Sequence, residues 1–267
     1  MRWVINVKSN YKPYLGGKIT IPSRYDGHDI TVLSDFTNID NLTHVYFEPT
    51  AKYDVIGDEA PGRAFIGFAY CNNLVSVKLP DTVRYIGGTG CFESNINSSS
   101  LEEVTLNDNI VSIGTEAFYY ANKLKLTALP ANLQMIGLAA FAYSSVEISN
   151  LPATMTEIFK GAFCGNSDFV MTHFGHIKNA PIDAETNNIT KIISDKGSGS
   201  YRYSFRGCFK GVTDIYLHDT LEYISPGAFY YILAGTGNST LTVHSYTDLV
   251  NESNYTDYFD SPNIIFT

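Results

Sequence analysis

The chain has 267 residues, of which 44% are hydrophobic and 17% are charged, and its formal net charge is −9. This composition supplies a sizeable apolar core and argues against a disordered chain, while the negative charge argues against nonspecific nucleic-acid binding and docking on an anionic membrane. Apolar runs stay well short of the about 20 residues of a transmembrane helix, so we expect no insertion into a membrane.

The first 21 residues are predicted to form an N-terminal cap. Apolar and polar side chains alternate over Trp3–Val7, SNYKPYLGG has the composition of a turn, and Lys18–Ile21 returns as a second strand. A hairpin of this kind would cover the open end of a stacked fold. The opening MRWVINVKSN lacks the long apolar run of a secretory signal peptide, so either a leader was removed or the protein reaches its place without one.

Two short phrases then alternate along the chain. The first has the form L-x-x-V-x-L, as in Leu101–Leu106, and the second has the form I-x-x-x-A-F, as in IGTEAFYYA at 113–121. The step from the end of the first phrase to the phenylalanine of the second is the same in four units: 106 to 118, 129 to 141, 151 to 163 and 217 to 229. Copies of the first phrase begin at Leu42, Leu74, Leu101, Leu124, Val146, Phe169, Ile189 and Val212.

A unit of roughly 23 residues cannot bury its own apolar side, so neighbouring units must stack and share a continuous core. The repeat therefore predicts one α/β-type solenoid domain over residues 1–267, mostly β and loop: a curved, right-handed stack of roughly 8–10 coils with a parallel sheet on its concave face. Repeats are expected at 22–240 and a C-terminal cap at 241–267. Residues 175–204 lose the repeat marks, which indicates one irregular coil or a break into two stacks.

The side-chain pattern assigns a face to each position. In L-x-x-V-x-L, the first, fourth and sixth positions are predicted to point into the core and the others outward. In the second phrase, Ile113 and Phe118 are predicted to be buried rungs of two ladders, with Ala117 kept small by the neighbouring coil.

The phrases NLVSVKLPDTVRYIGG and LNDNIVSIGTEAFYYANKL resemble the BspA-like leucine-rich repeat of bacteria and their phages. The resemblance covers about residues 17–260. It implies a leucine-rich-repeat fold and a role in bacterial surface adhesion, commonly to host or microbial proteins. The missing leader shifts weight toward a phage virion protein, such as a tail or receptor-binding component, and one variant of the repeat is similar to those of gut bacteria.

Residue types suited to catalysis or metal binding occur without a matching arrangement. We expect the four cysteines to be buried thiols, with Cys91 and Cys208 in the alanine place of Ala-Phe and Cys164 the most accessible. The close histidine pair in HFGH, at 173–176, lacks the third protein ligand that a zinc site needs. Nucleophile-elbow, metalloprotease and phosphate-loop motifs are missing. We therefore expect no enzyme activity, no catalytic residues, no metal and no cofactor.

The outward strand positions are the best candidates for a binding surface. Among them, Leu126, Ile148 and Met171, with Val170 and Ile193, would form an apolar patch that marks an interface. A register error in these coils is the open alternative, because a shift of one residue turns every side chain over. The candidate residues on the concave face are His44, Tyr46, Lys78, Glu103, Lys125, Leu126, Glu147, Ile148, Met171, His173, Lys191, Asp214 and Tyr216.

The leading functional hypothesis is a non-enzymatic recognition or adhesion module that binds a protein or a surface polysaccharide, or a second copy of itself, through the concave sheet. Its expected location is extracellular, on a cell surface or a phage virion, with the cytoplasm as an open alternative. A structural spacer or oligomerisation module of a larger assembly is the second hypothesis. An enzyme built on Cys164 and His173 is the remote one.

Overall fold

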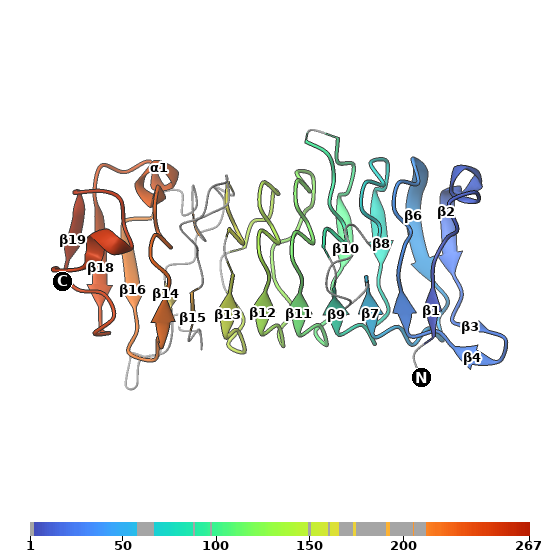
Figure 1. The fold of residues 1–267 in the computed structure, drawn as a ribbon, viewed down its shortest axis with the longest axis horizontal. Coiled ribbons are helices and arrows are strands. Elements are labelled where there is room, and N and C mark those ends of the chain that lie inside the picture. Colours follow the sequence, from blue (N-terminus) through green and yellow to red (C-terminus); the bar gives the residue numbers. More distant parts are fainter. Residues whose placement is uncertain are drawn as a thin grey trace.

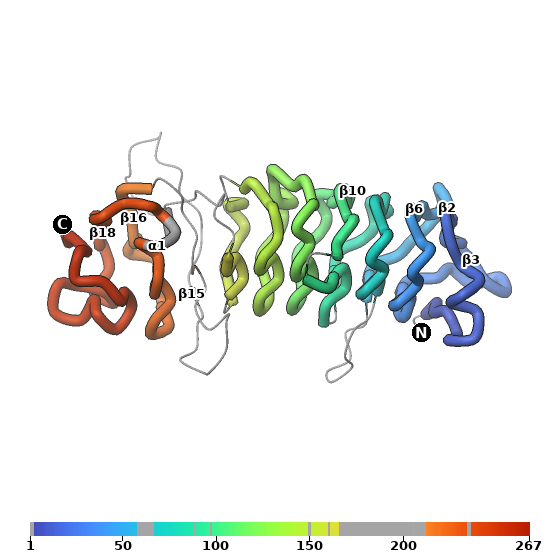
Figure 2. Tube along the Cα trace, turned by 90° about the horizontal axis from the view of Figure 1, so that it is seen from above, coloured from blue at the N-terminus to red at the C-terminus, as the bar shows by residue number. Residues whose placement is uncertain are grey.

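The computed structural model describes residues 3–57, 67–87, 89–96, 98–148, 151–159, 161–165, 173–174, 191–192, 205 and 212–267. Over these residues the chain is a mostly-β parallel solenoid of about eight turns with almost no helix, which confirms the predicted fold class. The coils follow one another along the long axis, with the two termini at opposite ends (Figures 1 and 2). None of the described helices is long and apolar enough to cross a membrane.

One sheet runs through the whole described stack. It contains nine short parallel strands, each supplied by one coil: β1 (Val4–Ile5), β5 (Val32–Leu33), β7 (Val55–Ile56), β9 (Tyr85–Ile86), β11 (Ser112–Ile113), β12 (Met135–Ile136), β13 (Glu157–Ile158), β15 (Lys191–Ile192) and β17 (Tyr223–Ile224). The isoleucine of the second phrase occupies the same register position in neighbouring coils, so that Ile86, Ile113 and Ile136 lie side by side. These residues form the first predicted ladder.

The L-x-x-V-x-L phrases form two separate sheets in the described part of the chain. The N-terminal sheet has the order β10-β8-β6-β2 and the C-terminal sheet the order β14-β16-β18-β19, and all neighbours are parallel. Their strands are β2 (Gly16–Ile21), β6 (Asn41–Phe47), β8 (Ser76–Lys78), β10 (Glu103–Thr105), β14 (His173–Phe174), β16 (Asp214–Leu217), β18 (Leu241–Ser245) and β19 (Ile264–Phe266). The described helical segments are η1 (Lys12–Tyr14), α1 (Ile232–Thr236) and η2 (Tyr255–Asp257).

The N-terminal segment is not the predicted hairpin. Strand β1 pairs in parallel with β5, and β2 pairs in parallel with β6, so residues 1–21 contribute a rung to each of two sheets. The connecting turn is held by Lys12, whose Nζ lies 2.6 Å from Asp35 Oδ1 and 3.0 Å from Thr37 Oγ1. Among the described residues the antiparallel pair is β3 (Arg24–Tyr25) with β4 (His28–Asp29), a small hairpin that projects beside the N-terminal end (Figure 1).

A ladder of phenylalanines fills the core. Neighbouring rings have centroids 4.9–6.5 Å apart and most are nearly parallel. Aromatic stacking of this kind adds to the stabilisation from burial. Ile113, Ala117 and Phe118 are fully buried, as predicted, so IGTEAFYYA is scaffold. The rungs are Phe36, Phe68, Phe92, Phe118, Phe141, Phe163, Phe205, Phe229 and Phe259.

The tight spacing of coils explains the small residues of the second phrase. A Cβ on Gly137 would lie 2.6 Å from the carbonyl carbon of Gly114 in the preceding coil, so glycine is required there for close approach. Two residues before the phenylalanine the backbone is left-handed, and Gly161 and Gly227 take that conformation freely, whereas Glu116 adopts it at φ 53°. Two residues after the phenylalanine, four tyrosines adopt left-handed conformations: Tyr70, Tyr120, Tyr143 and Tyr231.

The predicted outward orientation is wrong in the middle coils. The structure assigns no strand to residues 124–129 or 146–148, where Ile148 is fully buried and Leu126 is half-buried against the core. In these coils the apolar residue stands at the third position of the phrase and a polar one, such as Thr127, at the fourth. The third-position side chain therefore turns inward, and the proposed apolar patch loses both of its described members; Val170, Met171 and Ile193 lie outside the described residues.

The irregular coil is also out of phase with the prediction. Lys191 pairs with Glu157 and with Tyr223 in the nine-stranded sheet, so the segment from Ile189 supplies a second-phrase strand, not an L-x-x-V-x-L strand. Phe205 forms a ladder rung here, with its ring stacked between those of Phe163 and Phe229. Residues 175–190, including His176, and Cys208 lie outside the described residues.

Candidate functional site

The N-terminal sheet face, meaning the outward side chains of β2, β6, β8 and β10, gathers the largest single group of the described candidates. Strand pairing aligns them in rows. One row runs Lys18, His44, Ser76 and Glu103 from β2 to β10, and a second places Tyr46 of β6 beside Lys78 of β8. Alternation along each strand brings every second side chain to this face. Val45 and Val77, which lie between them, are fully buried.

Two neighbouring hollows open on this face. The first, of about 320 Å³, is lined by His44, Val75, Ser76, Glu102, Glu103 and Lys125. The second, of about 380 Å³, lies where β6 and β8 end and run into their turns, and its charged and aromatic residues are Tyr46, Phe47, Glu48, Lys78 and Asp81. Both hollows use strands β6 and β8, so they belong to one continuous surface.

The aromatic centre of this face is held in place by its neighbours. The rings of His44 and Tyr46 lie nearly parallel with centroids 6.5 Å apart, and Lys78 Nζ lies 5.9 Å from the centroid of the Tyr46 ring. Such a cation–π contact contributes about 0.5–1 kcal/mol at an exposed site. His44 Nδ1 also lies 2.9 Å from Thr43 Oγ1, which donates to the carbonyl of Gly17. The ring of Tyr46 is therefore oriented before any ligand arrives.

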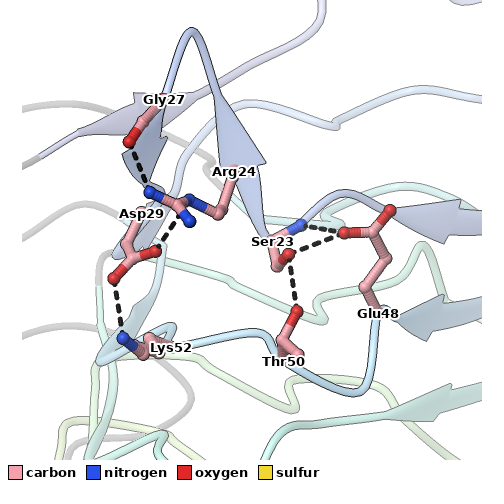
Figure 3. Close-up of polar contacts among 7 residues, drawn as sticks. All are labelled: Ser23, Arg24, Gly27, Asp29, Glu48, Thr50 and Lys52. Atoms are coloured by element: carbon pink, nitrogen blue, oxygen red, sulfur yellow. Dashed lines mark hydrogen bonds and ion pairs between the residues drawn. The ribbon is translucent and has the colours of Figure 1, made fainter.

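Some of the carboxylates in the hollows already have partners. Lys125 Nζ lies 3.4 Å from Glu102 Oε2. Glu48 Oε2 accepts hydrogen bonds of 2.7 Å from both the backbone N–H and the hydroxyl of Ser23, which also contacts Thr50 (Figure 3). The bond from the Ser23 hydroxyl, followed by that from its N–H, lowers the pKa of Glu48.

The β3–β4 hairpin is fastened to the coil that carries this carboxylate. Asp29 Oδ2 pairs with Lys52 Nζ at 2.8 Å, and its Oδ1 lies 3.2 Å from Arg24 Nε (Figure 3). The hydrogen bond from Lys52 holds the pKa of Asp29 below its ordinary value. Together with the Ser23–Glu48 contact, these bonds fix the position of the turn beside the second hollow.

Three further candidates lie on strands of the C-terminal sheet, away from both hollows. Asp214 and Tyr216 belong to β16, and His173 of β14 stands opposite Tyr216 in register. His244 of β18, which lay inside the predicted cap, stacks on Tyr216 with ring centroids 4.4 Å apart and places Nε2 2.8 Å from Asp214 Oδ1. Hydrogen bonds from Thr213 and then from His244 lower the pKa of Asp214. The alternation of apolar and polar residues in LTVHS is the sequence signal from which His244 could have been predicted as a candidate.

The structure thus separates the predicted candidates. His44, Tyr46, Lys78, Glu103 and Lys125 come together. Asp214, Tyr216 and the backbone of His173 form a second set, while Glu147 is exposed on a coil between the sheets. Leu126 and Ile148 face the core and Lys191 lies on the nine-stranded sheet. Met171 lies outside the described residues.

The chemistry available at these positions is that of noncovalent binding. Within the described residues, no group of three His, Cys, Asp or Glu side chains could hold a metal ion. Cys71, Cys91 and Cys164 are buried thiols, as predicted, but Cys164 is less exposed than Cys71, so the expectation that it is the most accessible is wrong. Burial raises the pKa of Cys71 to about 12, which keeps it an unreactive thiol.

Comparisons with known proteins agree with the repeat. Solved structures that are similar include a leucine-rich repeat protein of T. pallidum (23% identity, TM-score 0.49, covering 70% of this chain and 78% of that one). Another is a leucine-rich repeat protein from Bacteroides ovatus ATCC 8483 (18% identity, TM-score 0.45, covering 94% of this chain and 69% of that one). No curated protein sequence matches significantly. The BspA type leucine rich repeat region matches in six copies over residues 34–170, about half of the chain. The chain belongs to the BspA-type leucine-rich repeat family.

Proposed function

We propose that this chain is a non-enzymatic recognition module that binds another protein through the N-terminal sheet face. The observation that carries the proposal is the pair of neighbouring hollows on one sheet face, which share strands β6 and β8 and contain a pre-oriented aromatic ring. Tyrosine is among the side chains that contribute most to protein interfaces. A stacked backbone holds such a surface rigid, so a partner meets a preformed site.

The family supports a protein-binding repeat module in general terms. From the resemblance of the repeat, we also propose that the module acts on a bacterial cell surface or a phage virion, as an adhesion or receptor-binding component. Because Ile148 is buried, it cannot contribute to an apolar patch through which two copies of the chain would associate by their middle coils. We therefore favour a foreign protein over a second copy of the chain, and a protein over a polysaccharide.

The test is selection of binding peptides against the purified chain, followed by titration of the selected peptides in solution. Tyr46→Ala should weaken their binding at least about tenfold, because Tyr46 lies at the centre of the surface. Tyr223→Ala on the nine-stranded sheet is the matched control and should leave binding unchanged, since Tyr223 is exposed on another face. The proposal would be overturned if the selected peptides bound Tyr46→Ala as tightly as the unchanged chain. It would also be overturned if the chain bound a soluble polysaccharide and no peptide.

A further inference from the structure

We propose that the partner presents a basic segment to the N-terminal sheet face, and that Glu103 and Asp81 receive its lysine or arginine side chains. This inference rests on the proposed function and adds the chemistry of the partner. It concerns the two hollows only.

Each hollow contains two carboxylates, and in each hollow one of the two is already engaged. In the first, Glu102 pairs with Lys125, while Glu103 has no ion pair or hydrogen bond to the side chain of another described residue. In the second, Glu48 is held by Ser23, while the carboxylate of Asp81 is without such a partner among the described residues. Both Glu103 and Asp81 are exposed. One unengaged negative charge therefore remains in each hollow.

The cations of the hollows are committed to contacts within the chain. Lys125 faces Glu102, and Lys78 lies over the ring of Tyr46. Neither lysine forms an ion pair with Glu103 or Asp81. A partner that supplies two cationic groups would complete the charge pattern, whereas an acidic segment would meet like charge in both hollows.

The row of residues across the sheet gives the surface a direction. Lys18 stands on the edge strand β2, in register with His44, and Glu103 stands at the other end of the same row on β10. A basic segment is repelled at the β2 edge and attracted toward β8 and β10. We therefore place its cationic groups over Glu103 and Asp81 and its remaining contacts on Tyr46.

The net charge of the whole chain also favours a basic partner. A net charge of −9 attracts a basic partner over distances beyond contact, and this attraction is screened by salt. Binding of such a partner should therefore weaken as the salt concentration rises.

The experiment uses the peptides selected against the full chain. They should be enriched in Lys and Arg, and Glu103→Gln and Asp81→Asn should each weaken binding about threefold to tenfold, with a larger loss in the double variant. Raising the salt from about 50 mM to about 500 mM should weaken binding further. Lys18→Glu should tighten it, because the repulsion at the β2 edge becomes attraction.

The control is Glu252→Gln, which changes the net charge by the same amount at an exposed residue far along the chain. It should leave binding within about twofold, which separates local contacts from the long-range field. Selected peptides without basic residues would overturn the charge assignment and leave the proposed function standing. Full binding by the Glu103→Gln/Asp81→Asn double variant, while Tyr46→Ala still weakens binding, would do the same. Peptide binding that is unchanged in Tyr46→Ala would contradict both the charge assignment and the proposed function.

Discussion

The two sides of each coil behave differently along the stack. On the side of the second phrase, the nine-stranded sheet and the phenylalanine ladder keep one register through the described coils. On the side of the first phrase, the N-terminal sheet ends at β10, and the next strand among the described residues is β14. The continuous side repeats the same residues, Ile and Phe, at the same places in coil after coil. The interrupted side moves its apolar residue from the fourth position to the third, and the strand is lost.

The side with the phenylalanine ladder therefore maintains the solenoid, while the side of the first phrase tolerates variation in sequence. An identical large side chain in every coil must stack on its neighbours, so a change in one rung disturbs two contacts. The strand side exposes alternate residues to solvent, so its coils can differ in sequence and pairing. The candidate binding surface accordingly lies on the tolerant side.

Removing one phenylalanine from the ladder should have the strongest effect on stability. Phe118→Ala should lower the free energy of unfolding by about 3–5 kcal/mol, because the buried ring is lost from between Phe92 and Phe141 and a cavity remains. Denaturant-induced unfolding measures the effect. An unchanged midpoint would contradict the ladder as the main source of stability.

Glu93 adds a pH dependence to the same side of the coil. It follows Phe92, is only 9% exposed, and accepts a hydrogen bond of 2.9 Å from the hydroxyl of Tyr70. Burial raises the pKa of Glu93 from 4.5 to about 7. Folding therefore favours the protonated carboxyl, and its contribution to stability is complete below about pH 4.5 and is lost as the pH rises to about 7.

Glu93→Gln removes this loss. At pH 8 the variant should be more stable than the natural chain by about 1–3 kcal/mol, and at pH 4.5 the two should be similar. Thermal or denaturant unfolding at both pH values checks it. An equal difference at the two values would show that the ionisation of Glu93 is not the cause.

A paired substitution examines the interrupted side. Leu126→Thr should cost about 1–2 kcal/mol, because a half-buried side chain loses its contact with the core. Adding Thr127→Val restores an apolar residue at the fourth position, and the double variant should recover most of the loss. If the double variant is no more stable than Leu126→Thr, the position of the apolar residue does not control this coil.

The smallest expected effect concerns the backbone of the ladder side. Glu116 has φ 53°, in the place where Gly161 and Gly227 occur. Glu116→Gly should raise stability by about 0.5–1 kcal/mol by relieving this conformation. Glu116→Gln is the control, because it removes the charge and keeps the strained backbone. Equal stability of the two variants would mean that the left-handed conformation carries no cost here.

Much of the fold could be predicted from local pattern alone. The constant spacing between the two phrases determined the solenoid, the buried rungs Ile113 and Phe118, and the outward positions of His44, Tyr46, Lys78 and Glu103. These follow because a short repeat cannot bury its apolar side without stacking, and because alternation in a strand assigns each side chain to a face. The binding role of those residues stays a prediction.

Other features depend on contacts between coils and could not be predicted from the sequence of a single coil. Residues 1–21 joined two sheets because each strand found an unpaired edge of the second coil, which satisfies more backbone groups than a hairpin on its own. Lys191 lies in the nine-stranded sheet, where the next residue, Ile192, is in register between Ile158 and Ile224. The inward turn of Ile148 and the approach of His244 to Asp214 were likewise decided by neighbours. The repeat and its core could be read from the order of residues, since both are periodic. The contacts between side chains of different coils depend on the register between segments distant in the chain, so they became visible only in the folded molecule.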